Sequence, residues 1–243
     1  MKNKLSIIIL AAGKGTRMNS DLPKVLHKVK NKSMIEHVIY QSENLNPDKS
    51  IVVVGYKHEL VRKHLKSINL TFAMQEVQKG TAHAVMQCYD LLKDFNGCTL
   101  ILSGDVPLIK SKTLKDLYEI HMTNNSKATV LSAKVKNPFG YGRIIRDDKD
   151  NFKAIIEEKD ATENQKSINE INAGIYIFDN QILFKNINKI KNDNNQSEYY
   201  LPDILEIMIK QNLKIMVHQI EDENQIKGAN TENQLLELEK YAK

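Results

Sequence analysis

Along the first half of the chain, uninterrupted runs of apolar residues alternate with segments in which apolar residues recur at helical spacing. The aliphatic runs predict strands buried on both faces, at residues 7–10, 51–54, 70–74 and 99–102. Apolar residues that recur every three or four positions predict helices between the strands, at residues 34–45 with Ser33 as the cap, 58–67 and 80–92. This alternation is typical of a mostly parallel sheet that binds ligands at the carboxyl ends of its strands.

From Lys127 onward the pattern changes to strand-like runs joined by short polar turns, at residues 128–135, 142–146, 152–157 and 171–178. We expect these runs to be antiparallel additions that build a second wall over the first half. The remaining predicted elements are helices at 181–190 and 199–213, a strand at 215–220, and a helix opened by the capping box Thr231-Glu232-Asn233-Gln234. The predicted fold class is α/β: a Rossmann-like, mostly parallel sheet with helices on both faces and antiparallel additions.

The composition favours a soluble enzyme or binding protein over other classes. The 243 residues can form one domain with a substantial core, and 41% hydrophobic and 27% charged residues are ordinary for such a domain. The net charge is +5, but the lysines are scattered among acids and asparagines, so we expect no nucleic-acid partner. No apolar run approaches a membrane span, and Cys88 and Cys98 lack metal or redox spacing. We therefore expect a cytoplasmic protein without a membrane partner.

The first candidate for chemistry is the loop that follows the first strand, Ala11-Ala12-Gly13-Lys14-Gly15-Thr16-Arg17. Its small residues let the backbone approach a ligand, and N–H groups that point one way suit a phosphate chain. Arg17 and Lys24 add fixed positive charge at the same sheet edge. The loop lacks the ending of a Walker A motif, and Met18 stands where a dinucleotide fingerprint needs its third glycine. The alternative, a plain strand-to-helix connection, would not need two cations beyond the turn.

Asp105 follows the predicted strand at 99–102 in a turn of small residues. A carboxylate beside a triphosphate would repel it unless a Mg²⁺ ion lies between them, so we predict magnesium as the cofactor. The alternative is an Asp that caps the next helix. Gln75 ends another strand, and its amide can contact a base edge near Gly80, which permits a close approach. Because an amide can flip, Gln75 alone does not distinguish uracil from cytosine.

These residues carry a family resemblance. The segment LAAGKGTRM-x-S-x-LPK at residues 10–24 resembles the signature of sugar-nucleotide pyrophosphorylases. The VLH that follows is most similar to the bacterial N-acetylglucosamine-1-phosphate uridylyltransferases. The resemblance covers essentially the whole chain. It implies synthesis of UDP-N-acetylglucosamine and pyrophosphate from UTP and N-acetylglucosamine 1-phosphate, with Mg²⁺, in the supply of cell-wall peptidoglycan and lipopolysaccharide.

The resemblance also implies a role for each matching residue. It implies a nucleotide-binding half at 1–126, a sugar-phosphate half at 127–230 and a C-terminal helix at 231–243, in one domain. The implied nucleotide contacts are Leu10, Ala11, Ala12, Gly13, Lys24, Gln75, Gly80, Thr81, Ser103 and Asp105. The implied catalytic cations are Arg17 and Lys24, and the implied metal ligands are Asp105 and Asn230. The implied sugar-phosphate contacts are Gly142, Glu157 and Asn172. Ser103 departs from the bulkier residue expected there, and Asn230 has a structural alternative as the cap of the last helix.

Other interpretations stay open. A related transferase could use another sugar or CTP. A dinucleotide-binding oxidoreductase conflicts with the missing third glycine, and an inactive nucleotide-binding regulator conflicts with the intact Arg17, Lys24 and Asp105. Those bacterial relatives also carry a left-handed β-helix acetyltransferase. No hexapeptide repeat occurs in these 243 residues, so we expect no acetyl transfer and a monomer or weak oligomer.

Overall fold

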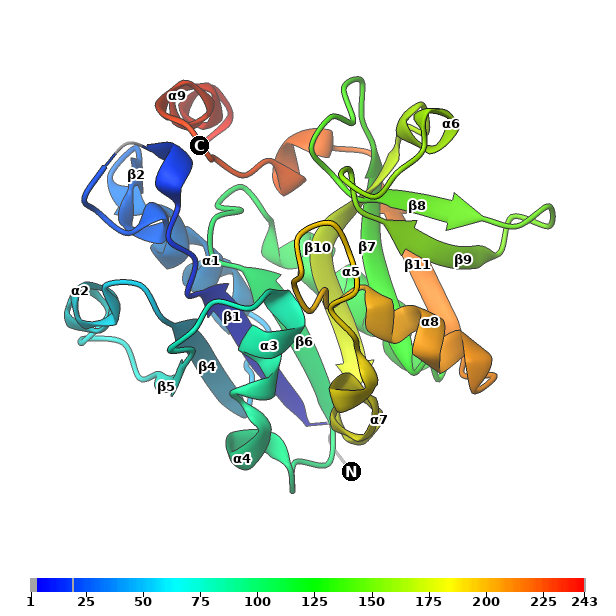
Figure 1. Cartoon of the computed structure of the whole chain (residues 1–243). Coiled ribbons are helices and arrows are strands. Elements are labelled where there is room, and N and C mark those ends of the chain that lie inside the picture. Colours follow the sequence, from blue (N-terminus) through cyan, green and yellow to red (C-terminus); the bar gives the residue numbers. More distant parts are fainter. Residues whose placement is uncertain (1–3, 19, 243) are drawn as a thin grey trace.

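The chain folds around a nine-stranded sheet in which the strand order is β11-β7-β10-β6-β1-β4-β5, with β8 and β9 paired beside β10 (Figure 1). The computed structural model describes residues 4–18 and 20–242. The strands are β1 (Leu5–Ala11), β2 (Lys28–Val29), β3 (Lys32–Ser33), β4 (Lys49–Val54), β5 (Thr71–Met74), β6 (Cys98–Ser103), β7 (Ala128–Lys134), β8 (Arg143–Arg146), β9 (Phe152–Ile156), β10 (Glu170–Asp179) and β11 (Ile215–Ile220).

Helices cover both faces of this sheet, as predicted (Figure 1). They are α1 (Met34–Glu43), α2 (His58–His64), α3 (Thr81–Met86), α4 (Tyr89–Leu92), α5 (Ser111–Thr123), α6 (Glu163–Lys166), α7 (Asn180–Asn186), α8 (Asp203–Lys210) and α9 (Glu232–Tyr241). Short 3-10 turns are η1 (Thr16–Met18), η2 (Lys24–Leu26), η3 (Ile187–Lys189) and η4 (Glu223–Ile226). Among the described residues, none of the helices is long and apolar enough to cross a membrane.

The first half of the sheet is parallel. β1 pairs in parallel with β4 and β6, and β4 with β5. Neighbouring residues of β1 alternate between the two cores: Ile7 and Ile9 pack with α1 and α5, whereas Ile8 packs with α3, α7 and α8. Because parallel strands end together, Leu10 lies opposite Ser103 at the carboxyl edge. This register brings the loops after β1 and β6 to one place.

The second half continues the same sheet. β10 lies between β6 and β7 and is antiparallel to both, so β7 and its parallel neighbour β11 run in the direction of β6. The expected antiparallel additions are therefore present around β10: β8 pairs with it in antiparallel, and β9 pairs in antiparallel with β8. The second wall that we expected is thus a continuation of the same sheet, joined edge to edge to the first half through β10.

Most of the predicted helices end earlier in the structure, and two of them differ most from the prediction. The helix expected at 80–92 is two helices, α3 and α4, because Gln87 and Cys88 bond to the carbonyls three residues earlier and tighten the chain. The helix expected at 199–213 begins only at Asp203, with Pro202 as its N-cap. Both predictions placed the apolar face correctly, since Val85, Cys88, Leu205 and Met208 are buried.

The last helix, α9, packs across the β2–β3 hairpin (Figure 1) through Leu238, which is buried against Val29 and Met34. Its N-cap is Thr231, whose hydroxyl accepts from the Gln234 N–H at 3.3 Å. The second hydrogen bond of the predicted capping box, from the Thr231 N–H to the Gln234 side chain, is not formed, so this half of the prediction is wrong. The Gln234 side chain accepts at 2.7 Å from the N–H of Asn230, one residue earlier than a capping box requires. This bond fixes the backbone of Asn230.

Candidate functional site

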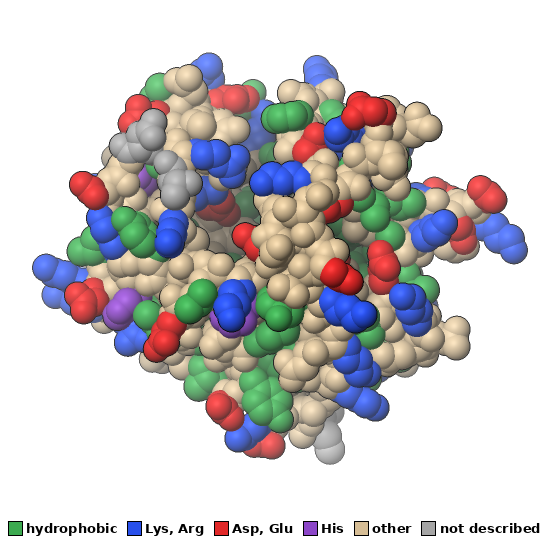
Figure 2. Space-filling model, in the orientation of Figure 1, with side chains coloured by type: hydrophobic (Ala, Val, Ile, Leu, Met, Phe, Trp, Pro, Cys, Tyr) green, Lys and Arg blue, Asp and Glu red, His purple; other side chains and the backbone are tan. Residues whose placement is uncertain are grey.

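A cleft of about 340 Å³ opens at the carboxyl ends of β1 and β6, with a second cavity of about 290 Å³ beside it. Both halves of the chain line the larger one, and Figure 2 shows the hollow between them with basic and acidic side chains around it. The smaller cavity is lined by Leu10, Ala11, Gly13, Gly15, Arg17, Lys24, Val25, Thr81, Ser103, Asp105 and Asn230. Most of the predicted nucleotide contacts therefore surround one space.

The loop after β1 leaves this space open. A Cβ added to Gly13 would meet no atom within 4 Å, which fits a backbone that a ligand can approach. Gly15 has a φ of +61°, and a Cβ there would lie 2.6 Å from the Cβ of Lys24. Glycine at this position therefore lets the stem of Lys24 pack against the loop. The Met18 N–H donates to the Gly15 carbonyl at 3.0 Å and closes the turn.

Four predicted residues from distant segments meet at one edge of the cavity. The Lys24 ammonium forms an ion pair with the Asp105 carboxylate and donates to Oδ1 of Asn230 at 2.5 Å. Arg17 donates to the same oxygen at 3.1 Å. Asp105 caps no helix, since the N-cap of α5 is Lys110, and Asn230 leaves the capping of α9 to Thr231. Helix capping, the structural alternative for both residues, is thereby excluded.

Gln75 and Gly80 line neither cavity. Gln75 is only 3% exposed, and its amide nitrogen donates to the Gly80 carbonyl at 3.1 Å. Gly80 has a φ of +104°, and a Cβ there would lie 2.6 Å from the Tyr199 carbonyl oxygen. The glycine is thus required by the packing of Tyr199, a reason different from the ligand approach that we predicted. Thr81 lines both cavities and accepts at 2.9 Å from the Leu201 N–H.

The three predicted sugar-phosphate contacts lie together in the larger cavity. The Asn172 N–H donates to the Gly142 carbonyl at 2.8 Å. A Cβ on Gly142 would lie 3.0 Å from Oε1 of Glu157. The Asn172 amide donates to the Tyr176 hydroxyl at 2.6 Å and accepts from the Gly174 N–H at 3.0 Å, across a bulge in β10. Tyr176 was not among the predicted contacts. Its position four residues after Asn172, on one strand, is a signal that could have found it.

Burial controls the charge of this pocket. Burial, followed by the carboxylates of Asp203 and Asp160, raises the pKa of Glu157 to about 7, while Arg143 opposes these effects. Burial likewise raises the pKa of Asp203 to about 6, with Glu206 as the next cause. Near neutral pH the Glu157 carboxyl can thus both donate a hydrogen bond as the acid and accept one as the carboxylate.

This pKa predicts how stability depends on pH. The Glu157 carboxyl has a higher pKa folded than unfolded, so its contribution to the free energy of unfolding is complete below its ordinary value of 4.5 and is lost as the pH rises to about 7. In Glu157→Gln the side chain cannot ionise, so the free energy of unfolding does not fall in this way as the pH rises. At pH 8 the variant should be about 3 kcal/mol more stable than wild type, with little gain at pH 4.5. Urea unfolding at both pH values measures it.

The matched control for this measurement is Glu163→Gln, which removes an exposed carboxylate that pairs, among the residues that the structure describes, with Lys166 in α6. It should give no pH-dependent gain, because surface ion pairs contribute little. Parallel stability curves for Glu157→Gln and wild type from pH 4.5 to 8 would contradict the assignment.

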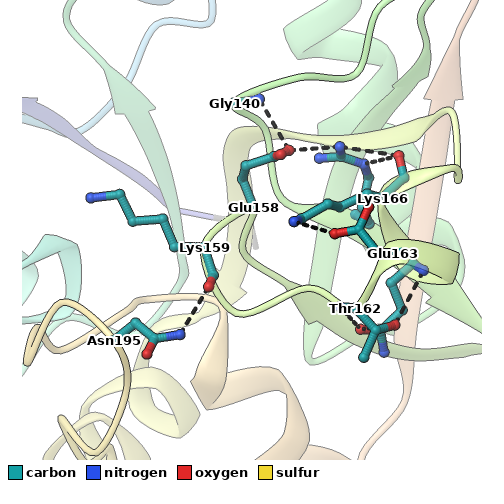
Figure 3. A network of polar contacts seen from close by, with 9 residues as sticks. Gly140, Glu158, Lys159, Thr162, Glu163, Lys166 and Asn195 are labelled. Atoms are coloured by element: carbon teal, nitrogen blue, oxygen red, sulfur yellow. Dashed lines mark hydrogen bonds and ion pairs between the residues drawn. The ribbon is translucent and has the colours of Figure 1, made fainter.

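A buried arginine holds the rim of the same pocket in place (Figure 3). Arg143 is 1% exposed and donates to the Glu158 carboxylate at 2.7 Å. Glu158 also accepts from the Gly140 N–H at 3.1 Å, so one carboxylate joins β8 to the loop before it. The Lys159 side chain points away from this network, while its carbonyl accepts from Asn195 at 2.8 Å. Since Gly140 to Gly142 line the cavity, the network positions its edge.

With this geometry in place, comparison with known protein families shows that residues 6–224 match the family described as nucleotidyl transferase. The chain belongs to the nucleotidyl transferase family. It is 46% identical over 233 residues to the bifunctional protein GlmU of Staphylococcus haemolyticus, covering 96% of this chain and 51% of that protein. It is 44% identical over 243 residues to the GlmU of Oceanobacillus iheyensis, covering 100% of this chain and 53% of that protein. The chain thus spans about half the length of these curated relatives.

Two solved structures share the fold of this chain. A putative glucose-1-phosphate thymidylyltransferase from Bacillus anthracis superposes with a TM-score of 0.77 at 20% identity, covering 98% of this chain and 95% of that one. A UDP-glucose pyrophosphorylase complexed with UDP-glucose gives a TM-score of 0.76 at 18% identity, covering 98% of each chain. At these identities the likeness concerns the fold alone, and it agrees with the predicted α/β class.

Proposed function

We propose that this nucleotidyltransferase forms UDP-N-acetylglucosamine and pyrophosphate from UTP and N-acetylglucosamine 1-phosphate. The observation that carries the proposal is the position of the Lys24, Asp105 and Asn230 cluster, which faces a pocket containing Glu157 and Asn172 across one continuous cleft. The identity to GlmU proteins and the resemblance in the sequence support these substrates.

The reaction needs no nucleophile from the protein. An oxygen of the sugar phosphate attacks the α-phosphorus of UTP while the bond from that phosphorus to the pyrophosphate oxygen breaks, so pyrophosphate leaves with the electron pair. The protein holds the two phosphates in line and neutralises charge. We assign Lys24 to the reacting phosphates, and Arg17 with the N–H groups of the loop after β1 to the β- and γ-phosphates.

Asp105 and Asn230 are the residues that would hold Mg²⁺. They fit the ion because a carboxylate oxygen of Asp105 and Oδ1 of Asn230 bind the same ammonium of Lys24, so two oxygens of the kind that magnesium prefers already converge on one cation. Among the described residues, no three His, Cys, Asp or Glu form a metal-binding group. A magnesium ion held by two protein ligands would take others from phosphates and water and would stabilise the charge that develops on the phosphates.

The proposal is tested by measuring product formation with UTP and CTP, each paired with N-acetylglucosamine 1-phosphate and with glucose 1-phosphate. We expect the highest kcat/KM for UTP with N-acetylglucosamine 1-phosphate. A higher value for CTP or for glucose 1-phosphate would overturn the substrate assignment and favour the related transferase.

The sugar pocket gives a further prediction. Asn172→Ala and Glu157→Ala should each raise the KM for the sugar phosphate by about 5- to 100-fold, since losing one partner of a buried hydrogen bond costs about 1–3 kcal/mol. The KM for UTP should change less than twofold, and steady-state kinetics with each substrate varied measures both. Asn151→Ala, in the exposed turn between β8 and β9, is the control and should leave both constants unchanged. An equal rise in both KM values would place the residues on the nucleotide side.

A further inference from the structure

A further cavity lies outside the candidate site. Its volume is about 440 Å³, larger than either cavity of that site. Its walls come from α1, from the loop between β6 and α5, from η4 and from the end of α9. Two of these walls, residues 107–110 and 224–225, lie close to Asp105 and Asn230 in the sequence. Within the described part of the chain, however, no residue lines both this cavity and a cavity of the candidate site, so it is a separate space.

The N-terminus of α5 fixes two glutamine amides in the wall of this cavity. Lys110, the N-cap residue, provides no capping side chain. Instead, Oε1 of Gln41 accepts from the Ser111 N–H at 2.8 Å. Oε1 of Gln225 accepts from the Lys110 N–H at 3.2 Å and from the Thr113 hydroxyl at 2.7 Å. Because a backbone N–H can only donate, each amide turns its oxygen toward the helix and its NH₂ group away from it.

Both NH₂ groups open into the cavity and have no acceptor among the residues that the structure describes. Gln225 is only 7% exposed, yet its Nε2 is not one of the enclosed side-chain atoms that lack a partner. Because Gln225 lines the cavity, this nitrogen reaches it. Nε2 of Gln41 is likewise not enclosed, and Gln41 lines the cavity as well. A buried donor without an acceptor is unfavourable, so both groups favour a ligand that supplies acceptor atoms.

The remaining lining groups set the charge and the shape of that ligand. The Lys110 ammonium pairs with the Asp222 carboxylate at 2.7 Å, and this hydrogen bond lowers the pKa of Asp222, so the two charges offset each other. The 13-residue helix α5 adds partial positive charge at its N-terminus, which favours an anion. A carboxylate fits this position, because it only accepts hydrogen bonds. Residues 107–109 and the Tyr241 ring provide an apolar wall beside it.

We propose that this cavity is a second binding site, for a small carboxylic acid with an apolar body, whose carboxylate accepts hydrogen bonds from the NH₂ groups of Gln41 and Gln225. A volume of about 440 Å³ lies within the usual range of small-molecule sites, about 300–1,000 Å³. An apolar lining with a few fixed polar groups is also typical of such sites. The inference is independent of the proposed function, because its ligand does not enter the substrate cleft.

The probe is 3-phenylpropanoate, compared with 3-phenylpropanol and 3-phenylpropylammonium, which have the same body and a different end group. ¹H–¹⁵N NMR on the wild-type protein follows the side-chain NH₂ signals of Gln41 and Gln225. Both signals should shift and saturate with the acid, and its Kd should be about tenfold or more lower than that of the alcohol or the ammonium. No saturating shift at about 10 mM acid, ten times a Kd of about 1 mM, overturns the proposal.

Gln225→Glu is the decisive variant. It keeps an acceptor for the Lys110 N–H and the Thr113 hydroxyl but replaces the NH₂ group with a carboxylate oxygen, which the helix N-terminus tolerates. The acid should bind about tenfold or more weakly and the ammonium more tightly, and Gln41→Glu should give the same loss. The matched control is Gln219→Glu, the same change in charge at an exposed position of β11, which should leave the Kd within about twofold of wild type. Undiminished acid binding in Gln225→Glu, with thermal unfolding like that of wild type, overturns the proposal.

Competition with UTP separates this cavity from the substrate cleft. The Kd of the acid should be the same within about twofold in saturating UTP, because the cavity shares no described lining residue with the candidate site. Displacement of the acid by UTP would place it among the cations of the substrate cleft and would overturn the proposal. Absence of any UTP-dependent product would instead refute the proposed function and leave the binding result standing, so the two failures are distinguishable.

Discussion

Asp105→Ala should lower kcat by about 10³-fold or more while the fold stays intact. The carboxylate is one of only two protein oxygens that would hold Mg²⁺ and it also pairs with Lys24, so its removal weakens both sources of charge stabilisation. A loss of this size corresponds to about 4 kcal/mol of transition-state stabilisation. Steady-state turnover together with thermal unfolding of the variant measures the two parts of the prediction.

The comparison for this variant is Asp116→Ala, which removes an exposed carboxylate paired with Lys112 and should leave turnover unchanged. Adding EDTA to the wild type should abolish activity, and excess Mg²⁺ should restore it. Binding of Mn²⁺ in the presence of UTP, followed by electron paramagnetic resonance, should be lost in Asp105→Ala. Near-normal turnover in this variant would remove Asp105 from the metal site.

The strands were the part of the fold that could be predicted most closely. β1, β4 and β6 each contain an uninterrupted aliphatic run because burial on both faces removes the polar alternation. The ends of the helices could not be predicted equally well. The break between α3 and α4 arises from short-range bonds at Gln87 and Cys88 that leave the apolar spacing unchanged.

The members of the candidate site could be predicted because strand ends meet at one edge, but their contacts could not. Lys24 and Asn230 are 206 positions apart, and their 2.5 Å contact depends on how η4 and α9 return to the first half. The hydrogen bond from the Asn230 N–H to Gln234 could not be predicted, because in the sequence Gln234 fits equally well the last position of a capping box. Likewise the orientation of the Gln75 amide is set by the Gly80 carbonyl in three dimensions.

Lys24→Ala should lower kcat by about 10²-fold or more and raise the KM for UTP by less than tenfold. The Lys24 side chain is only 14% exposed, and Asp105 and Asn230 hold its ammonium in place. Negative charge on the phosphate oxygens grows as the bond to pyrophosphate breaks, and a fixed cation therefore stabilises the transition state more than the bound substrate.

The same reasoning predicts a smaller loss of kcat for Arg17→Ala, because Arg17 is exposed and contacts only Asn230 among the described residues of this cluster. Lys28→Ala is the charge-matched control: its side chain is exposed in β2, four residues from Lys24 in the sequence, and its removal should leave both constants within twofold of wild type. If Lys24→Ala kept a normal kcat and changed only the KM for UTP, Lys24 would bind the ground state and transition state equally. The charge stabilisation would then have to come from Arg17 and the metal, and Arg17→Ala would show the larger loss of turnover.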